Sequence, residues 1–198
     1  MICTATDYAG QTFKELRLER ARLVSNEFHD CTFDRCSFTE TAFQNCRFVN
    51  CVFMRCDLSL LQVSKCSFAA ARFESSKVMG VNWTRARWSA AKLGPPVSFS
   101  KCAISHSTFI GLNLERIQIQ DCVSVDVDFR EADLSQADFA GTDLSDSLFL
   151  NTNLTTADLS RARNYQIDPS QNIVKGARFS LPEAISLLYN LDIVLVEK

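Results

Sequence analysis

Several features of enzymes, secreted proteins and membrane proteins are missing from this sequence. Neither sign of charge dominates, since 21 Lys and Arg face 23 Asp and Glu and the formal net charge is −2, so neither nucleic-acid binding nor attachment to a membrane surface is expected. No apolar run approaches the roughly 18 residues that suggest a membrane span. The first residues carry neither the basic segment nor the apolar stretch of a signal peptide. We therefore expect a cytoplasmic protein with reduced thiols.

Catalytic motifs are missing as well. Histidine occurs only twice, as His29 and His106, and these positions are far apart in the sequence. There is no Gly-rich phosphate loop, no nucleophile elbow and no zinc signature. The sequence therefore predicts a protein that is not an enzyme and that holds no cofactor and no metal.

What the sequence has instead is a period of five. Large apolar residues occupy every fifth position from Phe13 to Leu93, 17 times without a break. The pattern then shifts by one residue and continues from Phe99 to Leu159, where only Ser124 departs from it. A period of five matches neither a helix, at about 3.6 residues, nor an alternating strand, at about 2. It indicates a solenoid in which each five-residue unit places one large central residue in a common stack.

The position two residues before the central residue is small or modest in most units, and it holds eight of the nine cysteines. An odd total does not suit a complete disulfide framework, and the C-x4-C spacing differs from the C-x2-C of zinc sites. We interpret these cysteines as small core residues. They form four pairs spaced by 20 residues: Cys31 and Cys51, Cys36 and Cys56, Cys46 and Cys66, and Cys102 and Cys122.

Three units resemble a known repeat. Ala-Asp-Leu-Ser-Gln at 132–136, Ala-Asp-Phe-Ala-Gly at 137–141 and Ala-Asp-Leu-Ser-Arg at 157–161 are similar to the A(D/N)LXX unit of the pentapeptide-repeat family. The resemblance extends over roughly residues 11–163. It implies an all-β fold, a right-handed quadrilateral parallel β-helix, with one five-residue unit on each of the four sides of a coil.

Three segments follow from this interpretation. Residues 1–10 are expected to form an N-terminal cap, and residues 11–180 the β-helix. The register slip at 94–98 coincides with Gly94, Pro95 and Pro96, and Gly and Pro interrupt regular structure. We interpret this stretch as a small bulge leaving the rod, with a tolerated insertion as the alternative.

Residues 181–198 are expected to form a short helix and a short strand. Pro182 and Glu183 suit a helix start. A solenoid needs its terminal coil covered, so the segment is interpreted as a cap, a dimer interface or both. The apolar side chains expected at a homodimer interface are Leu187, Leu188, Leu191, Ile193 and Leu195.

Charge is distributed unevenly along the repeats. Residues 11–93 hold 13 basic and 8 acidic side chains, a net of +5, whereas residues 121–168 hold 3 basic and 10 acidic side chains, a net of −7. Because Asp is part of the repeat consensus, two interpretations stay open: an acidic binding surface, or consensus alone. The candidate acidic surface comprises Asp126, Asp128, Glu131, Asp133, Asp138, Asp143, Asp146 and Asp158.

Within the family, the register slip, Gly80-Val81-Asn82-Trp83 and the run 177–184 before an apolar helix resemble the topoisomerase-protecting members. These are the albicidin-resistance, microcin B17 immunity and Qnr types. The resemblance implies a homodimer that mimics DNA, binds DNA gyrase, with topoisomerase IV as a second candidate, and relieves poisoning. The Qnr type has longer projecting loops, so a peptide or natural-product poison is expected rather than a quinolone. The alternative is a passive scaffold or interaction module without a topoisomerase partner.

Overall fold

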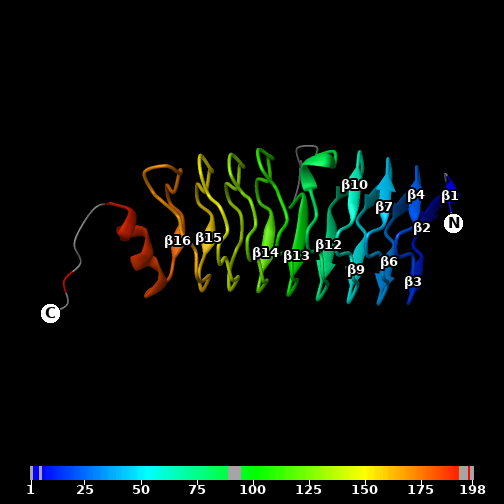
Figure 1. Ribbon diagram of the computed structural model, residues 1–198, viewed down its shortest axis with the longest axis horizontal. Coiled ribbons are helices and arrows are strands. Elements are labelled where there is room, and N and C mark those ends of the chain that lie inside the picture. The colour runs from blue at the N-terminus through cyan, green and yellow to red at the C-terminus, as the bar shows by residue number, and fades with distance from the viewer. Residues whose placement is uncertain (1, 5, 89–94, 192–195, 197–198) are drawn as a thin grey trace.

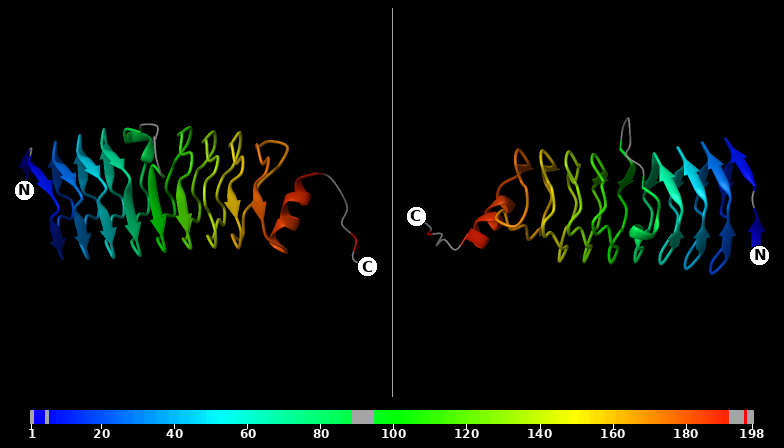
Figure 2. Two further views of the ribbon diagram at one scale, coloured as in Figure 1. Left: turned by 180° about the vertical axis from the view of Figure 1, so that it is seen from behind. Right: turned by 90° about the horizontal axis from the view of Figure 1, so that it is seen from above.

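The chain winds into a parallel β-solenoid, as the sequence predicted. The computed structural model describes residues 2–4, 6–88, 95–191 and 196. Figure 1 shows the coils stacked along one axis, with the N-terminus at one end and the 3-10 helix η2 (Glu183–Leu191) beyond the last coil. The views from behind and from above in Figure 2 show the same single column of coils. Among the described residues, no helix is long and apolar enough to cross a membrane.

Three sides of the solenoid carry sheets whose strands come from successive coils. The first side contains β1 (Ile2–Thr4), β4 (Arg22–Val24), β7 (Ala42–Gln44) and β10 (Gln62–Ser64). The second contains β2 (Asp7–Ala9), β5 (Glu27–His29), β8 (Arg47–Val49) and β11 (Ser67–Ala69). The third contains β3 (Thr12–Lys14), β6 (Thr32–Asp34), β9 (Val52–Met54), β12 (Ala71–Glu74), β13 (Val97–Ser100) and β14 (Gln118–Gln120), and β15 (Asp158–Leu159) pairs with β16 (Arg178–Phe179) further along.

The fourth side is held by single parallel bridges, which run from Arg17 to Ser37 and onward to Arg163. The pairing also begins earlier than expected. Ile2 lies opposite Arg22, and β2 pairs with β5 in the same way. The described residues of the segment 1–10 are therefore strands of the first coil, where a separate cap was predicted.

The central residues form aromatic ladders inside the coils. On the third side Phe33 stacks on Phe53 with ring centroids 4.7 Å apart and 7° between the planes, and Phe53 stacks on Phe73 at 4.9 Å. Each of these rings is buried. Burying a Phe side chain stabilises the fold by roughly 1.5–3 kcal/mol. This repeated stack explains why the period of five is so regular in the sequence.

The small position before each central residue also makes a hydrogen bond. The thiol of Cys51 donates to the Phe28 carbonyl at 3.3 Å, and the hydroxyl of Ser76 donates to the Phe53 carbonyl at 3.1 Å. Both partners lie 23 residues earlier, on the preceding coil. The eight described cysteines are free and buried, so their interpretation as core residues is confirmed. They are not merely small hydrophobes, because their sulfhydryls satisfy inward-facing carbonyls.

Each corner of the solenoid needs a left-handed backbone residue. The residue two positions after a central residue has positive φ, as at Asn45 with 52° and Arg55 with 55°. Gly80 occupies such a corner with φ +67°, and a Cβ there would lie 2.6 Å from Leu60 Cδ2. Glycine removes both the steric cost of this conformation and that close contact.

The interruption between the two halves is longer than the sequence pattern suggested. Phe53 pairs with Phe73, 20 residues on, but Phe73 pairs with Phe99, 26 residues on. Six residues are therefore inserted where a slip of one was predicted. A period of five cannot distinguish one extra residue from one extra residue plus a whole unit.

The predicted bulge at 94–98 differs from the structure for the same reason. The six extra residues lie between Trp88 and Pro95, outside the described residues, and Gly94 is among them. Pro96 is buried, and its carbonyl accepts a hydrogen bond from the Ala70 N–H at 3.0 Å. Val97 begins strand β13. Pro96 is thus part of the rod, and Pro95, half-buried, precedes it.

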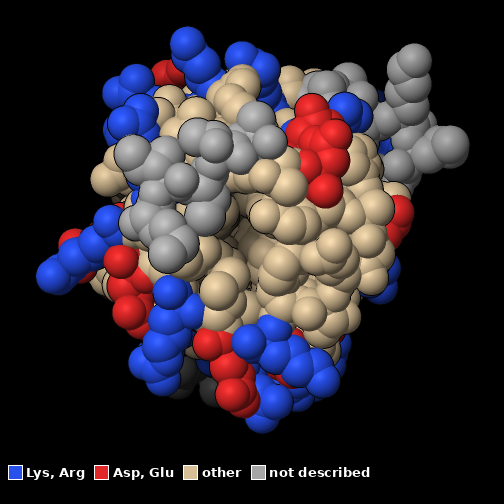
Figure 3. All heavy atoms as spheres, turned by 90° about the vertical axis from the view of Figure 1, so that its right-hand side faces the viewer, with Lys and Arg blue, Asp and Glu red and all other residues tan. Residues whose placement is uncertain are grey.

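The two ends of the solenoid differ. At the N-terminal end, Figure 3 shows a hollow among uncharged residues, ringed by charged side chains. A cavity of about 230 Å³ opens there onto the core. It is lined by Tyr8, Phe13, Leu16, Leu18, Leu23, Asn26, Phe28, Phe33, Phe38, Phe43 and Phe48. At the other end, η2 lies beside the last coil, and the expected strand that follows it falls mostly outside the described residues.

Candidate functional site

The structure divides the acidic candidates into two groups. The first, which we call the turn aspartates, stands one residue before a buried central residue. Asp143 is typical: its Oδ1 accepts the Ser145 N–H at 3.1 Å, so the carboxylate closes the turn. Asp and Asn favour such turns because their side chains can hydrogen-bond a backbone N–H two residues on. The turn aspartates are Asp128, Asp133, Asp138, Asp143 and Asp158, all half-buried.

Neighbouring side chains also engage the carboxylates of the turn aspartates, three through arginine and two through amides. Asp143 pairs with Arg163 at 3.2 Å, Asp128 with Arg130 at 2.7 Å, and Asp158 with Arg178 at 3.0 Å. Asp133 accepts from Asn153 and Asp138 from Gln120, at 2.9 Å and 2.6 Å. Their carboxylates therefore serve the fold first, and the consensus interpretation applies to these five.

Hydrogen bonding also lowers the pKa of Asp143 and Asp128 within this group. Burial alone would raise the pKa of Asp143, but hydrogen bonds from Ser145 and Asn164 outweigh it and lower the pKa to about 2. The hydrogen bonds and positive charge of Arg130 likewise lower the pKa of Asp128 below its usual value. Groups held in the ionised form in this way contribute stability rather than a free negative charge.

The second group, which we call the corner acids, consists of Asp126, Glu131 and Asp146. Their φ angles are 55°, 61° and 56°, which places them at corners, and their side chains are exposed. Asp126 and Asp146 occupy the same corner of successive coils, since the Asp126 N–H donates to the Ser145 carbonyl at 2.9 Å. Strand-like spacing places such neighbours about 4.8 Å apart. The corner acids are therefore the part of the candidate surface that projects into solvent.

One further acid belongs with this group by position. Asp121, with φ of 51°, is an exposed corner residue of the same half. A Cβ at Gly141, the corner above it, would lie 2.3 Å from Asp121 Oδ1. The sequence contained the signal for this residue, because Asp121 lies two residues after the central Ile119. The preceding-Asp consensus drew attention to the turn aspartates instead.

Both histidines face carboxylates, although the sequence offered no sign of this. His106 Nδ1 lies 2.9 Å from Asp126 Oδ2, and His29 Nε2 lies 3.4 Å from Glu27 Oε2. His106 stands on the same corner as Asp126, one coil earlier. Among the described residues, no group of three or more His, Cys, Asp or Glu is placed to hold a metal ion.

The basic N-terminal half contains several ion pairs. Arg20 pairs with Glu40 at 3.1 Å and Arg55 with Asp34 at 2.6 Å, each across successive coils. The surplus of positive charge is therefore interspersed with acids and does not form a uniform basic face.

The expected interface residues have different environments. Leu187 packs against the core of the solenoid and so acts as part of the cap. Leu188 and Leu191 are 37% and 43% exposed. Ile193 and Leu195 lie outside the described residues. The described helix thus leaves Leu188 and Leu191, together with the 69% exposed Tyr189, available to a second molecule.

Comparison with known families agrees with this architecture. A model of the pentapeptide repeat region matches residues 26–95, and a model of eight pentapeptide repeats matches residues 125–163. The chain belongs to the pentapeptide-repeat family. The interruption described above lies at the end of the first match. Among the curated proteins, none matches the chain in sequence.

Solved pentapeptide-repeat structures share the fold at low identity. A trypsin-treated form of QnrB1, a plasmid-mediated fluoroquinolone resistance protein, has a TM-score of 0.73 at 16% identity, with 99% of each chain covered. Full-length QnrB1 has a TM-score of 0.61 at 18% identity, covering 98% of this chain and 100% of its own. HetL, involved in heterocyst differentiation regulation in the cyanobacterium Nostoc sp. strain PCC 7120, has a TM-score of 0.67 at 15% identity, covering 85% and 84%. At these identities the likeness concerns the fold.

Proposed function

We propose that this pentapeptide-repeat protein binds DNA gyrase in the cytoplasm through its corner acids and protects the enzyme from a peptide or natural-product poison. The observation that carries the proposal is the exposed set Asp126, Glu131 and Asp146 on the C-terminal half. The fold likeness to a fluoroquinolone resistance protein over nearly the whole chain supports it.

The electrostatic argument rests on what gyrase must bind. A DNA duplex carries one negative charge per roughly 1.7 Å of its axis, so a DNA-binding surface is basic. A rod with acids at the corners of coils about 4.8 Å apart presents a sparser row of negative charge along a similar line. Complementary charge speeds encounter and fixes orientation. The attraction weakens as salt screens it.

A second molecule would extend this acidic surface. If two chains join through Leu188 and Leu191, their acidic halves meet near the two-fold axis, and their basic halves point outward. An isologous two-fold interface is the commonest arrangement of a homodimer. Leu188→Asp with Leu191→Asp is expected to give a monomer by light scattering, and a monomeric parent at micromolar concentration would remove the dimer from the proposal.

The experiment is a gyrase supercoiling assay in the presence of a peptide or natural-product poison, with a fluoroquinolone as a second arm. The parent protein is expected to restore supercoiling against the first class. The triple variant Asp126→Asn, Glu131→Gln, Asp146→Asn is expected to lose at least tenfold in gyrase affinity at low salt, because it removes the projecting charges while every turn aspartate stays.

The matched control carries the same chemistry on the basic half. The control triple is Glu15→Gln, Asp30→Asn and Glu40→Gln. The three native residues also stand at exposed corners with positive φ, and the triple also removes three negative charges. This control is expected to bind gyrase like the parent. An equal loss of gyrase affinity in both triple variants would mean that binding depends on net charge alone and not on the position of the acids. A parent that binds no gyrase at all would favour the passive scaffold instead.

A further inference from the structure

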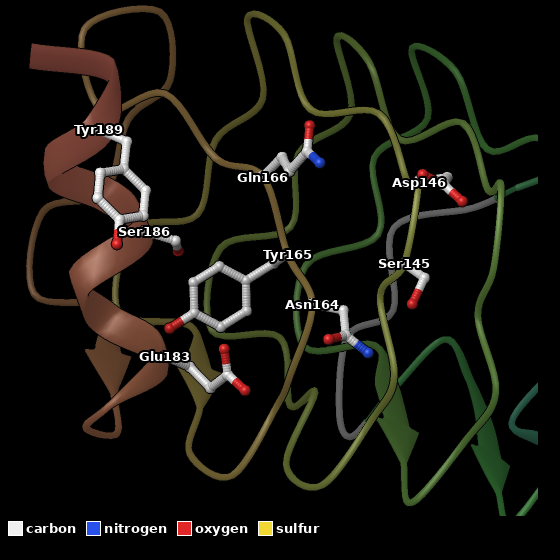
Figure 4. A pocket seen from close by; sticks show the side chains of 8 residues that line it. All are labelled: Ser145, Asp146, Asn164, Tyr165, Gln166, Glu183, Ser186 and Tyr189. Carbon is white, nitrogen blue, oxygen red and sulfur yellow. The ribbon is translucent and has the colours of Figure 1, made fainter.

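A polar cavity lies between η2 and the last coils. Of the three corner acids, its described lining includes only Asp146. Its volume is about 660 Å³, within the usual range of about 300–1,000 Å³ for small-molecule sites. Figure 4 shows Asp146 and Ser145 on the coil side, Glu183, Ser186 and Tyr189 on the helix, and Tyr165 between them. Asn164 and Gln166 complete the wall.

Two hydroxyl groups of this cavity have no hydrogen-bond partner within the part of the chain that the structure describes. Tyr165 is only 2% exposed, and its hydroxyl is buried without a partner, as is Ser186 Oγ. The Tyr165 ring is held in place by Phe179, with ring centroids 5.6 Å apart. Buried polar groups in native proteins are nearly always hydrogen-bonded, so an exception of this kind calls for an explanation. A bound donor would supply one.

The charge of the cavity selects the kind of donor. Asp146 and Glu183 contribute two carboxylates, and no Lys or Arg is among the described lining residues. The nearest arginine in sequence, Arg163, is engaged with Asp143. Asn164 donates to Asp143 as well, at 3.0 Å. The lining is therefore rich in acceptors and negative charge and lacks a cation of its own.

The aromatic walls favour the same ligand. Tyr189, which is 69% exposed, presents ring surface to the cavity, and Tyr165 forms part of its wall. A cation over an aromatic face is attracted by the ring quadrupole. Burial, with the negative charge of Glu183, raises the pKa of Tyr165 to about 12. The phenol thus stays neutral at physiological pH, and its oxygen can accept a hydrogen bond from an ammonium group.

We propose that this cavity binds a linear diamine or polyamine. One ammonium group pairs with Asp146, the other with Glu183 at the helix, and the methylene chain crosses the cavity between them. The hydroxyls of Tyr165 and Ser186 accept the remaining N–H groups. This binding site shares only Asp146 with the proposed gyrase-binding surface, because Glu183, Tyr165 and Ser186 belong to neither the corner acids nor the turn aspartates.

The test uses the full chain and isothermal titration calorimetry with spermidine and 1,4-diaminobutane. The uncharged analogue 1,4-butanediol serves as a ligand control and is expected not to bind. Asp146→Asn and Glu183→Gln are each expected to weaken spermidine binding at least tenfold. Asp126→Asn removes the same charge from the same corner one coil earlier, outside the cavity, and is expected to change the affinity less than twofold. Equal weakening by Asp126→Asn, or no binding by the parent at millimolar spermidine, overturns the proposal.

A second variant separates ligand binding from structural support. Tyr165→Phe removes only the unpartnered hydroxyl, so the ligand-free variant is expected to melt at the same temperature as the parent or higher. Its spermidine affinity is expected to fall at least threefold, and the spermidine-induced rise in melting temperature is expected to shrink accordingly. Parent-like affinity in Tyr165→Phe contradicts the assigned role of the hydroxyl.

A second copy of the chain is the competing occupant. Light scattering with and without spermidine distinguishes a cavity that binds the polyamine from one that is filled by a second copy of the chain. Spermidine that binds the parent without changing its oligomeric state supports the proposal. Binding seen only after Leu188→Asp and Leu191→Asp have made the protein monomeric shows that the partner copy fills the cavity, and overturns it.

Discussion

The two halves of the solenoid share one core but differ in the backbone structure of their sides. In the N-terminal half, residues 2–88, three of the four sides are formed by three-residue strands such as β5 and β8. In the C-terminal half, residues 95–180, most sides are single bridges such as Asp133 to Asn153. The central residues are equally buried in both, as Phe48 and Phe139 are 1% and 0% exposed. The difference therefore comes from outside the core.

The residue before the central residue contributes to this difference. Where it is Asp, as at Asp133, its carboxylate accepts the N–H of Ser135 and closes a turn. In strand β9, Val52 instead continues the pairing with the neighbouring coils. Asp57 makes the same turn in the N-terminal half, where it accepts the Ser59 N–H at 3.0 Å. The Asp side chain supports such turns but is not required for them, since Val123 stands at a single bridge that is also followed by a turn.

The largest expected effect on stability tests whether the two halves share one core. Phe48→Ala and Phe139→Ala are each expected to lower the free energy of unfolding by about 3–5 kcal/mol, because each leaves a cavity in a close-packed stack. Arg47→Ala, next to Phe48 and exposed, is expected to stay within about 0.5 kcal/mol. Urea denaturation at pH 7 measures all three. A cost for Phe139 far below that for Phe48 would mean that the halves do not share one core.

The next effect tests the turn aspartates. Asp143→Ala is expected to cost about 1–2 kcal/mol at pH 7, since it removes several hydrogen bonds at once. The folded-state pKa of Asp143, about 2, lies below the ordinary aspartate value of 3.8. Its contribution is therefore fully present above about pH 4 and is lost as the pH falls through 2.

The control for this prediction is Gln62→Ala. Gln62 occupies the same repeat position in strand β10 and is exposed, so its loss is expected to change stability by about 0.5 kcal/mol or less. Denaturation curves from pH 7 to pH 2 should show the gap between parent and Asp143→Ala closing in acid. A gap that stays constant with pH contradicts the ionised-carboxylate explanation.

A smaller effect concerns the one break in the central pattern, which lies in the C-terminal half. Ser124 is fully buried, and its hydroxyl has no partner among the described residues. Ser124→Ala is therefore expected to stabilise the fold by about 1 kcal/mol. Ser147→Ala should do the opposite by about 1 kcal/mol, because its hydroxyl donates to the Ser124 carbonyl at 2.6 Å and accepts from Val127 N–H at 3.2 Å. Thermal melts of both variants decide the sign.

The smallest effect concerns the position that is cysteine-rich in one half and hydroxyl-rich in the other. Cys51→Ser is expected to change stability by less than about 1 kcal/mol, because a hydroxyl can make the bond that Ser76 makes to its own carbonyl partner. Cys51→Ala, which loses that bond, should be the less stable of the two in urea. The reverse order would show that size alone selects residues at this position.

Much of the fold was readable from the sequence because a solenoid repeats one local solution. The central residues, the small residues before them and the 20-residue spacing of pairs such as Cys31 and Cys51 all follow from the period of five, and β-pairing confirms it. The candidate site was less readable. Repeat position separates the turn acids from the corner acids, but the structure was needed to show what each position does. The Ser145 N–H donates to the Asp143 carboxylate, whereas the neighbouring Asp146 is exposed.

The sequence by itself determined the parallel solenoid, its core and the residues that face inward, because burial of one large side chain per unit leaves a periodic record in the chain. Tertiary structure alone decided the length of the insertion, since 26 and 21 residues are equivalent to a period of five. It also decided which carboxylates are free, and it created the cavity at η2. Tyr165 and Glu183 are separated in sequence and belong to no shared pattern. They meet only because the chain folds back over its last coil.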